Sequence, residues 1–170
     1  TRYISVTGVQ TCALPIYKAK PRIGLVWSGN LQHKNDHNRS LALSDLIKFL
    51  PPDFDYFSLQ KEVRVQDEKI LTSSFIKHYE NELIDFADTA ALMHHLDLVI
   101  SVDTAAAHLA GALGRPLWIP LNSYGHCWRW MLDRDDSPWY TTARLFRQER
   151  YGDWSAPMAK IAKFLGFFKI

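Results

Sequence analysis

The residues with the clearest chemical potential are Asp103, Thr104 and His108, which stand close together in the chain. They follow Leu98–Val102, an apolar run that is typical of a buried parallel strand. Asp and Thr often cap helices, and the three alanines before His108 leave the first backbone N–H groups of a helix accessible. Such a helix start binds anions. The stretch therefore predicts either an anion site or an ordinary capped turn.

Each of these polar residues has more than one role open to it. Asp103 could act as a general base, accept from a hydroxyl group or cap the helix. Thr104 could donate to a phosphate or act as the cap itself. His108 falls in the first turn of an apolar helix and needs a polar partner there, which a phosphate, a ribose or a backbone carbonyl would supply.

A second group of polar residues surrounds the end of an earlier apolar run. Ser28 and Gly29 follow that run directly, and a polar loop with Lys34 and Arg39 comes next. A glycine turn with two cations suits a diphosphate, although both cations could simply be solvated. The chain has neither G-x-G-x-x-G nor G-x-x-x-x-G-K-[ST], which disfavours a dinucleotide fingerprint and a P-loop.

We expect no metal site. His33 and His37 are spaced as zinc ligands can be, with Asp36 between them, but the segment reads as a loop without an obvious third ligand. His126 and Cys127 match no recognisable nucleophile arrangement. The stretch 128–140 holds three Trp and one Tyr, which could stack on sugars or bases, or anchor a loop in the core.

Alternating strand and helix patterns must position these residues. The expected strands are Ile23–Trp27, Phe54–Leu59, Phe75–Tyr79, Leu98–Val102, Leu117–Leu121 and Ala143–Phe146. The expected helices are Leu41–Leu50, Glu62–Leu71, Asp85–Leu96, a segment from Thr104 to a Gly114 cap, and Met158–Phe168. This order predicts an α/β fold, a Rossmann-like and mostly parallel sheet with helices on both faces. Ligands bind such sheets at the carboxyl ends of the strands.

Composition narrows the class of protein. The 170 residues suit one domain, which we place at 18–170, and residues 1–17 lack a matching period and read as extraneous. A net charge of +2 gives no reason to expect nucleic-acid binding. The two cysteines form no CxxC pair, which favours a reducing, cytoplasmic setting. No apolar run approaches the roughly 20 residues that span a membrane.

Several segments together carry a resemblance to a known family. They are 23–30, Lys34, 38–40, 57–61, 85–90, 99–116, 128–130 and 137–140. Over Pro21 to Leu165 the chain resembles the C-terminal part of bacterial tetratricopeptide-repeat glycosyltransferases. These are similar to the glycosyltransferase family that contains the lipopolysaccharide heptosyltransferases. The resemblance implies the C-terminal half of a GT-B fold, which binds a nucleotide-sugar donor without an obligatory metal or other cofactor.

The resemblance also assigns roles by position. Asp103, Thr104, Ala105 and His108 would hold the diphosphate and sugar of the donor. Contacts to the phosphates would come from Ser28, Gly29 and Lys34, and Lys34 and His108 would stabilise the leaving group. Gln60 lies where the nucleoside is held, and Asp88 borders that pocket.

Two departures qualify the resemblance. Heptosyltransferases often have glycine where Ala105 stands, and a methyl group there narrows the approach of a phosphate. The chain also lacks the N-terminal acceptor domain, which is expected to supply the catalytic base, and shows no repeat of about 34 residues.

The leading hypothesis is therefore the donor-binding domain of a glycosyltransferase, inactive alone, with an unidentified protein or glycan as acceptor. The missing N-terminal domain would be its main partner, or a homodimer could cover the same face. The alternatives are a non-catalytic nucleotide-binding or interaction module, and a sugar-nucleotide epimerase.

Overall fold

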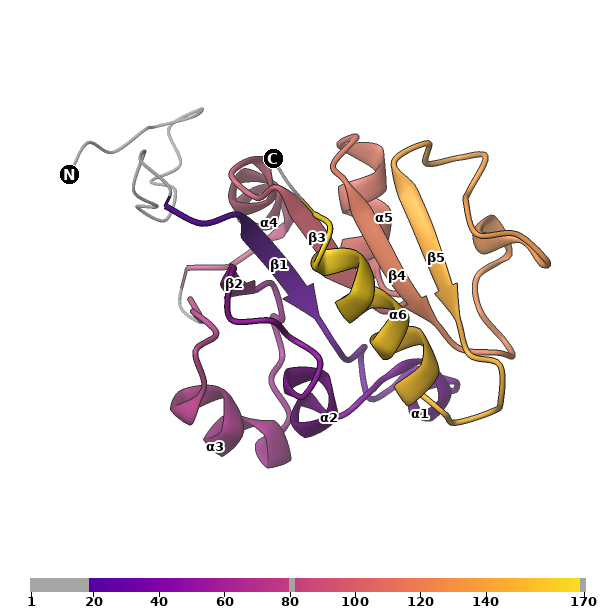
Figure 1. The fold of residues 1–170 in the computed structure, drawn as a ribbon. Helices are drawn as coiled ribbons and strands as arrows, with labels where there is room; N and C mark the ends of the chain where they lie inside the picture. Colours follow the sequence, from indigo (N-terminus) through magenta and orange to yellow (C-terminus); the bar gives the residue numbers. More distant parts are fainter. Residues whose placement is uncertain (1–18, 80–81, 169–170) are drawn as a thin grey trace.

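The computed structural model describes residues 19–79 and 82–168 of the chain. Within them, five apolar runs form one parallel sheet in the order β2-β1-β3-β4-β5 (Figure 1). The strands are β1 (Arg22–Val26), β2 (Asp55–Ser58), β3 (Leu98–Ser101), β4 (Leu117–Leu121) and β5 (Ala143–Arg147). The predicted α/β class with a Rossmann-like parallel sheet is confirmed.

Helices cover both faces of this sheet, as the buried side chains of each strand require. Leu98 and Ile100 point into one core and Val99 into the other, because side chains alternate along a strand. The first core packs against α2 (Leu43–Ile47), α3 (Val65–Ser73) and α6 (Ser155–Leu165). The second core packs against α4 (Phe86–His94) and α5 (Ala105–Ala112). Figure 1 shows α6 in front of the sheet and α4 and α5 behind it.

Local signals fix the ends of the two helices behind the sheet. Asp85 caps α4, accepting from the N–H groups of Ala87 at 2.7 Å and Asp88 at 3.1 Å, and Asp88 returns the contact in a capping box. Helix α5 ends at Ala112, and Gly114 terminates it two residues later with a φ of 64°, which glycine readily adopts, as the sequence predicted. Pro116 then leads directly into β4.

Several boundaries differ from the prediction. Phe75–Tyr79 forms one parallel bridge, Phe57 to Lys77, instead of a strand: Lys77 bonds to the backbone of Tyr56 and Ser58, and the pairing extends no further. The polar loop before Leu41 holds a single turn, α1 (Asp36–Arg39). Helix α6 begins three residues earlier than expected, since Pro157 is tolerated in a first turn. The aromatic stretch 128–140 begins with a 3-10 helix, η1 (Trp128–Trp130).

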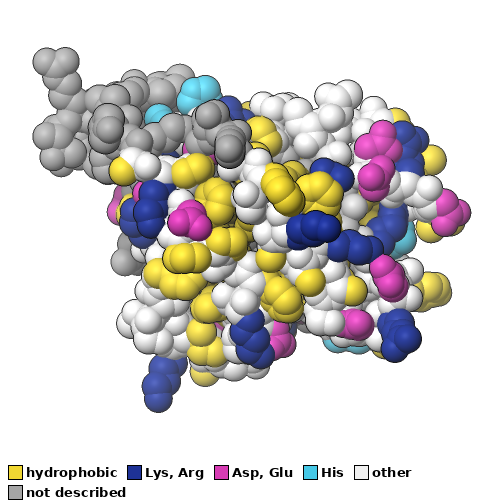
Figure 2. All heavy atoms as spheres, viewed as in Figure 1, with side chains coloured by type: hydrophobic (Ala, Val, Ile, Leu, Met, Phe, Trp, Pro, Cys, Tyr) yellow, Lys and Arg dark blue, Asp and Glu magenta, His cyan; other side chains and the backbone are white. Residues whose placement is uncertain are grey.

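The outer surface is mixed in character. Figure 2 shows acidic and basic side chains interspersed with hydrophobic ones on the face that carries α6. Among the described residues, no helix has both the length and the apolar character needed to cross a membrane. The prediction that residues 1–17 are extraneous falls outside the described part of the chain.

Candidate functional site

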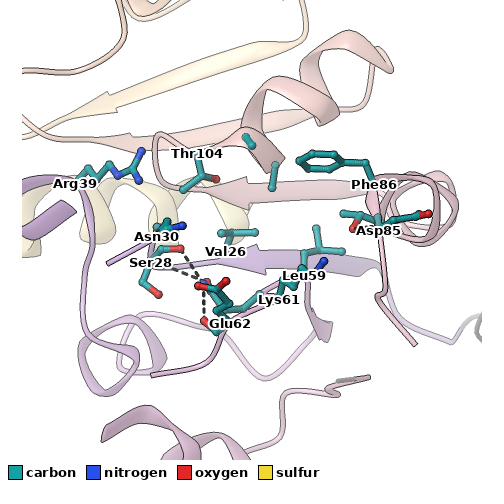
Figure 3. Close-up of a pocket in the computed structure, with 15 residues that line it drawn as sticks. Val26, Ser28, Asn30, Arg39, Leu59, Lys61, Glu62, Asp85, Phe86 and Thr104 are labelled. Atoms are coloured by element: carbon teal, nitrogen blue, oxygen red, sulfur yellow. Dashed lines mark hydrogen bonds between the residues drawn. The ribbon is translucent and has the colours of Figure 1, made fainter. Parts of the chain in front are cut away.

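A cavity of about 530 Å³ opens where the carboxyl ends of β1 and β2 meet the starts of α4 and α5. Parallel sheets of this kind bind ligands at this edge. Figure 3 shows Arg39, Thr104, Ser28 and Asn30 at one end of the cavity and Asp85 and Phe86 at the other. The lining residues are Val26, Ser28, Gly29, Asn30, Arg39, Leu59, Gln60, Lys61, Glu62, Asp85, Phe86, Thr89, Thr104, Ala105 and Ala106.

The start of α5 forms one wall of the polar end. Thr104 is the N-cap residue, but its side chain makes no capping hydrogen bond; its hydroxyl lies 3.1 Å from the Ser101 hydroxyl instead. The first N–H groups of a helix have no partner inside it. Ala105 and Ala106 line the cavity with nothing larger than a methyl group. This helix start can therefore offer its N–H groups and the positive end of its dipole to an anion.

A partly buried cation, Arg39, completes that end. One guanidinium nitrogen of Arg39 donates to the backbone carbonyl of Asp103 at 3.0 Å, and Nε lies 3.5 Å from a carboxylate oxygen of Asp36. The guanidinium rests against Gly29 so closely that a Cβ on this glycine would lie 2.4 Å from it. Gly29 therefore leaves room for the cation at the edge of the cavity.

The backbone around Ser28 is held by one amide side chain. Gln60 Oε1 accepts from the N–H groups of Trp27 and Ser28, both at 3.2 Å, and Gln60 Nε2 donates to the Ser28 carbonyl at 2.8 Å. The Ser28 hydroxyl is buried and has no hydrogen-bond partner among the described residues. A buried hydroxyl without a partner costs free energy, so a ligand in the cavity could stabilise it.

The opposite end of the cavity is more apolar. Val26 and Leu59 lie between the two ends, and the ring of Phe86 reaches over the cavity from α4 (Figure 3). Phe86 is 61% exposed, which is unusual for a phenylalanine that packs only as core. An aromatic ring beside aliphatic side chains suits a flat organic group.

Asp103 and His108 do not line the cavity; they contact the aromatic segment, which we define as residues 126–140. The Asp103 carboxylate is buried and accepts from the Cys127 N–H and from Trp130 Nε1, both at 2.7 Å. His108 stacks on Trp130, with ring centroids 4.8 Å apart, and its Nδ1 lies 3.2 Å from the Tyr140 hydroxyl. Through these contacts Asp103 and His108 hold the aromatic segment against the start of α5.

The surroundings of His108 favour the neutral form of its imidazole. Burial lowers the pKa of His108, and the positive charge of Arg129 lowers it further, whereas Asp103 opposes both effects. A neutral ring can donate or accept a hydrogen bond but brings no charge of its own to an anion.

The predicted site residues thus fall into three groups. Ser28, Gly29, Gln60, Thr104 and Ala105 line the cavity together. Asp88 does not line it, and its carboxylate is occupied in the capping box of α4; Asp103 and His108 face the aromatic segment. Lys34 is exposed on the loop before α1 and does not line the cavity. Their roles toward a ligand stay predictions.

Other lining residues were not singled out from the sequence. Asn30, Lys61 and Ala106 each come directly after a predicted site residue, so their position beside the strand ends was the available signal. Phe86 lies at the start of the helix expected over Asp85–Leu96, and its exposed ring was not foreseen. Asp36, between the two histidines considered for zinc, is buried and paired with Arg39 and Arg64.

Comparison with known proteins shows that part of the chain is similar to a known family. The family model "Glycosyltransferase family 9 (heptosyltransferase)" matches residues 83–122, which include α4, β3, α5 and β4. The chain is 27% identical over 155 residues to "Protein FlbA" of Caulobacter vibrioides. That match covers 87% of this chain and 25% of FlbA, so the chain spans about a quarter of its relative's length. The chain therefore contains a domain similar to glycosyltransferase family 9.

Proposed function

We propose that this domain binds the nucleotide-sugar donor of a glycosyltransferase in the cavity between β1, β2, α4 and α5. The observation that carries the proposal is the pairing of a cationic, N–H-rich end with an apolar end in one cavity. A nucleoside diphosphate has the same division, because its phosphates are charged and its base is flat. The match to glycosyltransferase family 9 over 83–122 supports the same function.

The polar end would hold the diphosphate. The α5 N–H groups at Ala105 and Ala106, the Arg39 guanidinium and the Ser28 hydroxyl all meet there. Negative charge on the diphosphate grows as the sugar departs, so these fixed donors would stabilise the transition state more than the ground state. The geometry favours Arg39 over Lys34 as the cation, because Lys34 lies outside the cavity.

The base would lie at the apolar end. Phe86 offers a ring face there, and Leu59 and Val26 supply aliphatic surface between this ring and the polar end. Gln60 would act indirectly, because its amide is occupied in holding the backbone of residues 27–28. Its role in this proposal is to position Ser28.

The acceptor and the catalytic base would come from another part of a longer protein. The chain spans about a quarter of FlbA, and a GT-B enzyme closes two domains over its donor. We propose that this domain alone binds the donor and transfers little sugar, and that binding needs no divalent cation, because Arg39 and the α5 terminus neutralise the phosphates. A non-catalytic nucleotide-binding module is the alternative, and a sugar-transfer assay on the full-length protein separates the two.

Calorimetric titration of the chain with nucleoside diphosphates and nucleotide sugars tests donor binding. The informative pair is Arg39→Gln and Arg64→Gln, because both arginines pair with Asp36 but only Arg39 lines the cavity. We expect Arg39→Gln to weaken diphosphate binding by about tenfold and Arg64→Gln to leave it within about twofold.

Two outcomes would overturn the proposal. One is that no nucleoside diphosphate or nucleotide sugar binds to the folded wild-type chain. The other is that Arg39→Gln and Arg64→Gln weaken binding equally, which would assign the loss to the shared Asp36 network instead of the cavity.

A further inference from the structure

A cluster of potential metal ligands lies beside the cavity, in the contact between α5 and the aromatic segment. Asp103, His108 and Cys127 each direct one ligand atom toward the others, and these atoms all lie within 4.8 Å of one another. His108 Nε2 is 3.8 Å from a carboxylate oxygen of Asp103. Sequence separation hides this cluster, because Cys127 belongs to a different segment from the other two residues.

We propose that Asp103, His108 and Cys127 form a Zn²⁺ site with its fourth position open to solvent. One carboxylate, one imidazole and one thiolate are the ligand types that zinc takes. At Zn–ligand lengths of about 2.0–2.3 Å, the donor atoms of a tetrahedral site stand roughly 3.5 Å apart. The three groups therefore need to close by only about 1 Å, which side-chain rotation can supply. Cys127 would bind as the thiolate and release its proton to solvent.

Surrounding contacts already orient the three ligands. Tyr140 lies at hydrogen-bond distance from His108 Nδ1, which leaves Nε2 as the nitrogen that faces Asp103. Trp130 Nε1 and the Cys127 N–H both donate to the Asp103 carboxylate. Outer contacts of this kind fix ring orientation and carboxylate geometry in metal sites.

One neighbouring charge works against the ion. An Arg129 guanidinium nitrogen lies 3.6 Å from the Cys127 sulfur while the group stacks over Trp128. A bound cation would repel this guanidinium, which would have to give up its contact with the sulfur. Removing the charge should therefore strengthen zinc binding, a result that mere damage to the fold would not produce.

Cobalt spectroscopy on the 170-residue chain tests the site without any variant. We expect one equivalent of Co²⁺ to give a cobalt–thiolate charge-transfer band and tetrahedral ligand-field bands, both lost when Zn²⁺ is added. We also expect Zn²⁺ to protect Cys127, and not Cys12, from alkylation as read by mass spectrometry. Absence of a thiolate band at one equivalent, or equal protection of the two cysteines, would overturn the proposal.

Variants then assign the ligands by direct Zn²⁺ titration. Cys127→Ser and His108→Ala should each weaken binding by about 100-fold, whereas Cys12→Ser, the matched thiol control, should leave it unchanged. Arg129→Gln should tighten binding by about tenfold. Unchanged affinity in Cys127→Ser, or weaker binding in Arg129→Gln, would contradict the assignment. None of these readings depends on donor binding or sugar transfer, so the metal site and the proposed function can fail separately.

Discussion

Polar groups at and near the turn after β3 face two different regions, the cavity on one side and the aromatic segment on the other. On the cavity side, the α5 N-terminus lacks a side-chain cap and the nearby Ser28 hydroxyl is buried without a partner. On the side of the aromatic segment, the Asp103 carboxylate and the His108 ring have close contacts. Unpaired donors are costly unless a ligand uses them, whereas paired groups repay their burial within the fold. The contrast separates a binding surface from a structural fastening within one short stretch.

The largest expected effect is on stability, at the aromatic segment. Asp103→Asn replaces a buried acceptor oxygen by an NH₂ group, so either the Cys127 N–H or Trp130 Nε1 loses its acceptor. We expect the free energy of unfolding to fall by about 2 kcal/mol. Urea unfolding measures the change, and Asp45→Asn, whose carboxylate is exposed and paired with Lys48, should stay within about 0.5 kcal/mol. Equal losses of unfolding free energy in the two variants would show that the Asp103 contacts contribute no more to stability than an exposed ion pair.

A substitution on the cavity side should instead weaken ligand binding. Gly29→Ala places a Cβ against the Arg39 guanidinium, which must move away from the polar end. We expect nucleoside diphosphate binding to weaken by about tenfold in calorimetric titration. In an Arg39→Gln background the same change should add little, because the two substitutions act on one contact. Additive losses would show that Gly29 acts by another route.

Two buried serines, one on each side, give the most closely matched comparison. Ser28 has an unpaired hydroxyl, whereas the Ser137 hydroxyl donates to the Arg129 carbonyl at 3.0 Å. Ser28→Ala should weaken diphosphate binding by about fivefold without lowering stability, since it removes an unsatisfied group. Ser137→Ala should lower stability by about 1 kcal/mol and leave binding unchanged. Urea unfolding and calorimetry on both variants measure these changes. A loss of stability in Ser28→Ala together with a loss of binding in Ser137→Ala would contradict the comparison.

The smallest expected effect is a pH dependence of stability. Burial lowers the pKa of His108 below its ordinary 6.5, so the unfolded chain takes up the proton first as pH falls. The contribution of His108 to the free energy of unfolding is therefore fully present above pH 6.5 and declines below it. His95 adds to the decline, because burial lowers its pKa too. His108→Gln should reduce the slope between about pH 7 and pH 5; an unchanged slope would mean that His108 is not held neutral.

Much of the fold could be predicted from local patterns. The apolar run Leu98–Val102, the caps at Asp85 and Gly114, and the alternation of strands and helices are encoded within a few residues each. The grouping of Ser28, Gln60 and Thr104 could also be predicted, because the carboxyl ends of parallel strands share one edge of the sheet. These predictions needed no knowledge of long-range pairing beyond the order of the elements.

What could not be predicted depends on side-chain partners far apart in the chain. Asp103 pairs with Trp130, and Arg39 with the Asp103 carbonyl, through turns whose course the sequence does not reveal. For the same reason the sequence could not distinguish Lys34 from Arg39 as the cation of the site, although of these two only Arg39 lines the cavity. His108 could be given a polar partner from its position, but whether this was a phosphate or a tyrosine hydroxyl depended on where Tyr140 folds.

An amide NMR titration with a nucleoside diphosphate tests the central claim most directly, because it reports both sides of the turn at once. Binding in the cavity predicts the largest shifts at Gly29, Ala105 and Ala106, which line its polar end. Amides of Ser137 and Trp139, in the aromatic segment, should shift little. Shifts centred on the aromatic segment, or none at saturating ligand, would contradict the assignment of the cavity as the donor site.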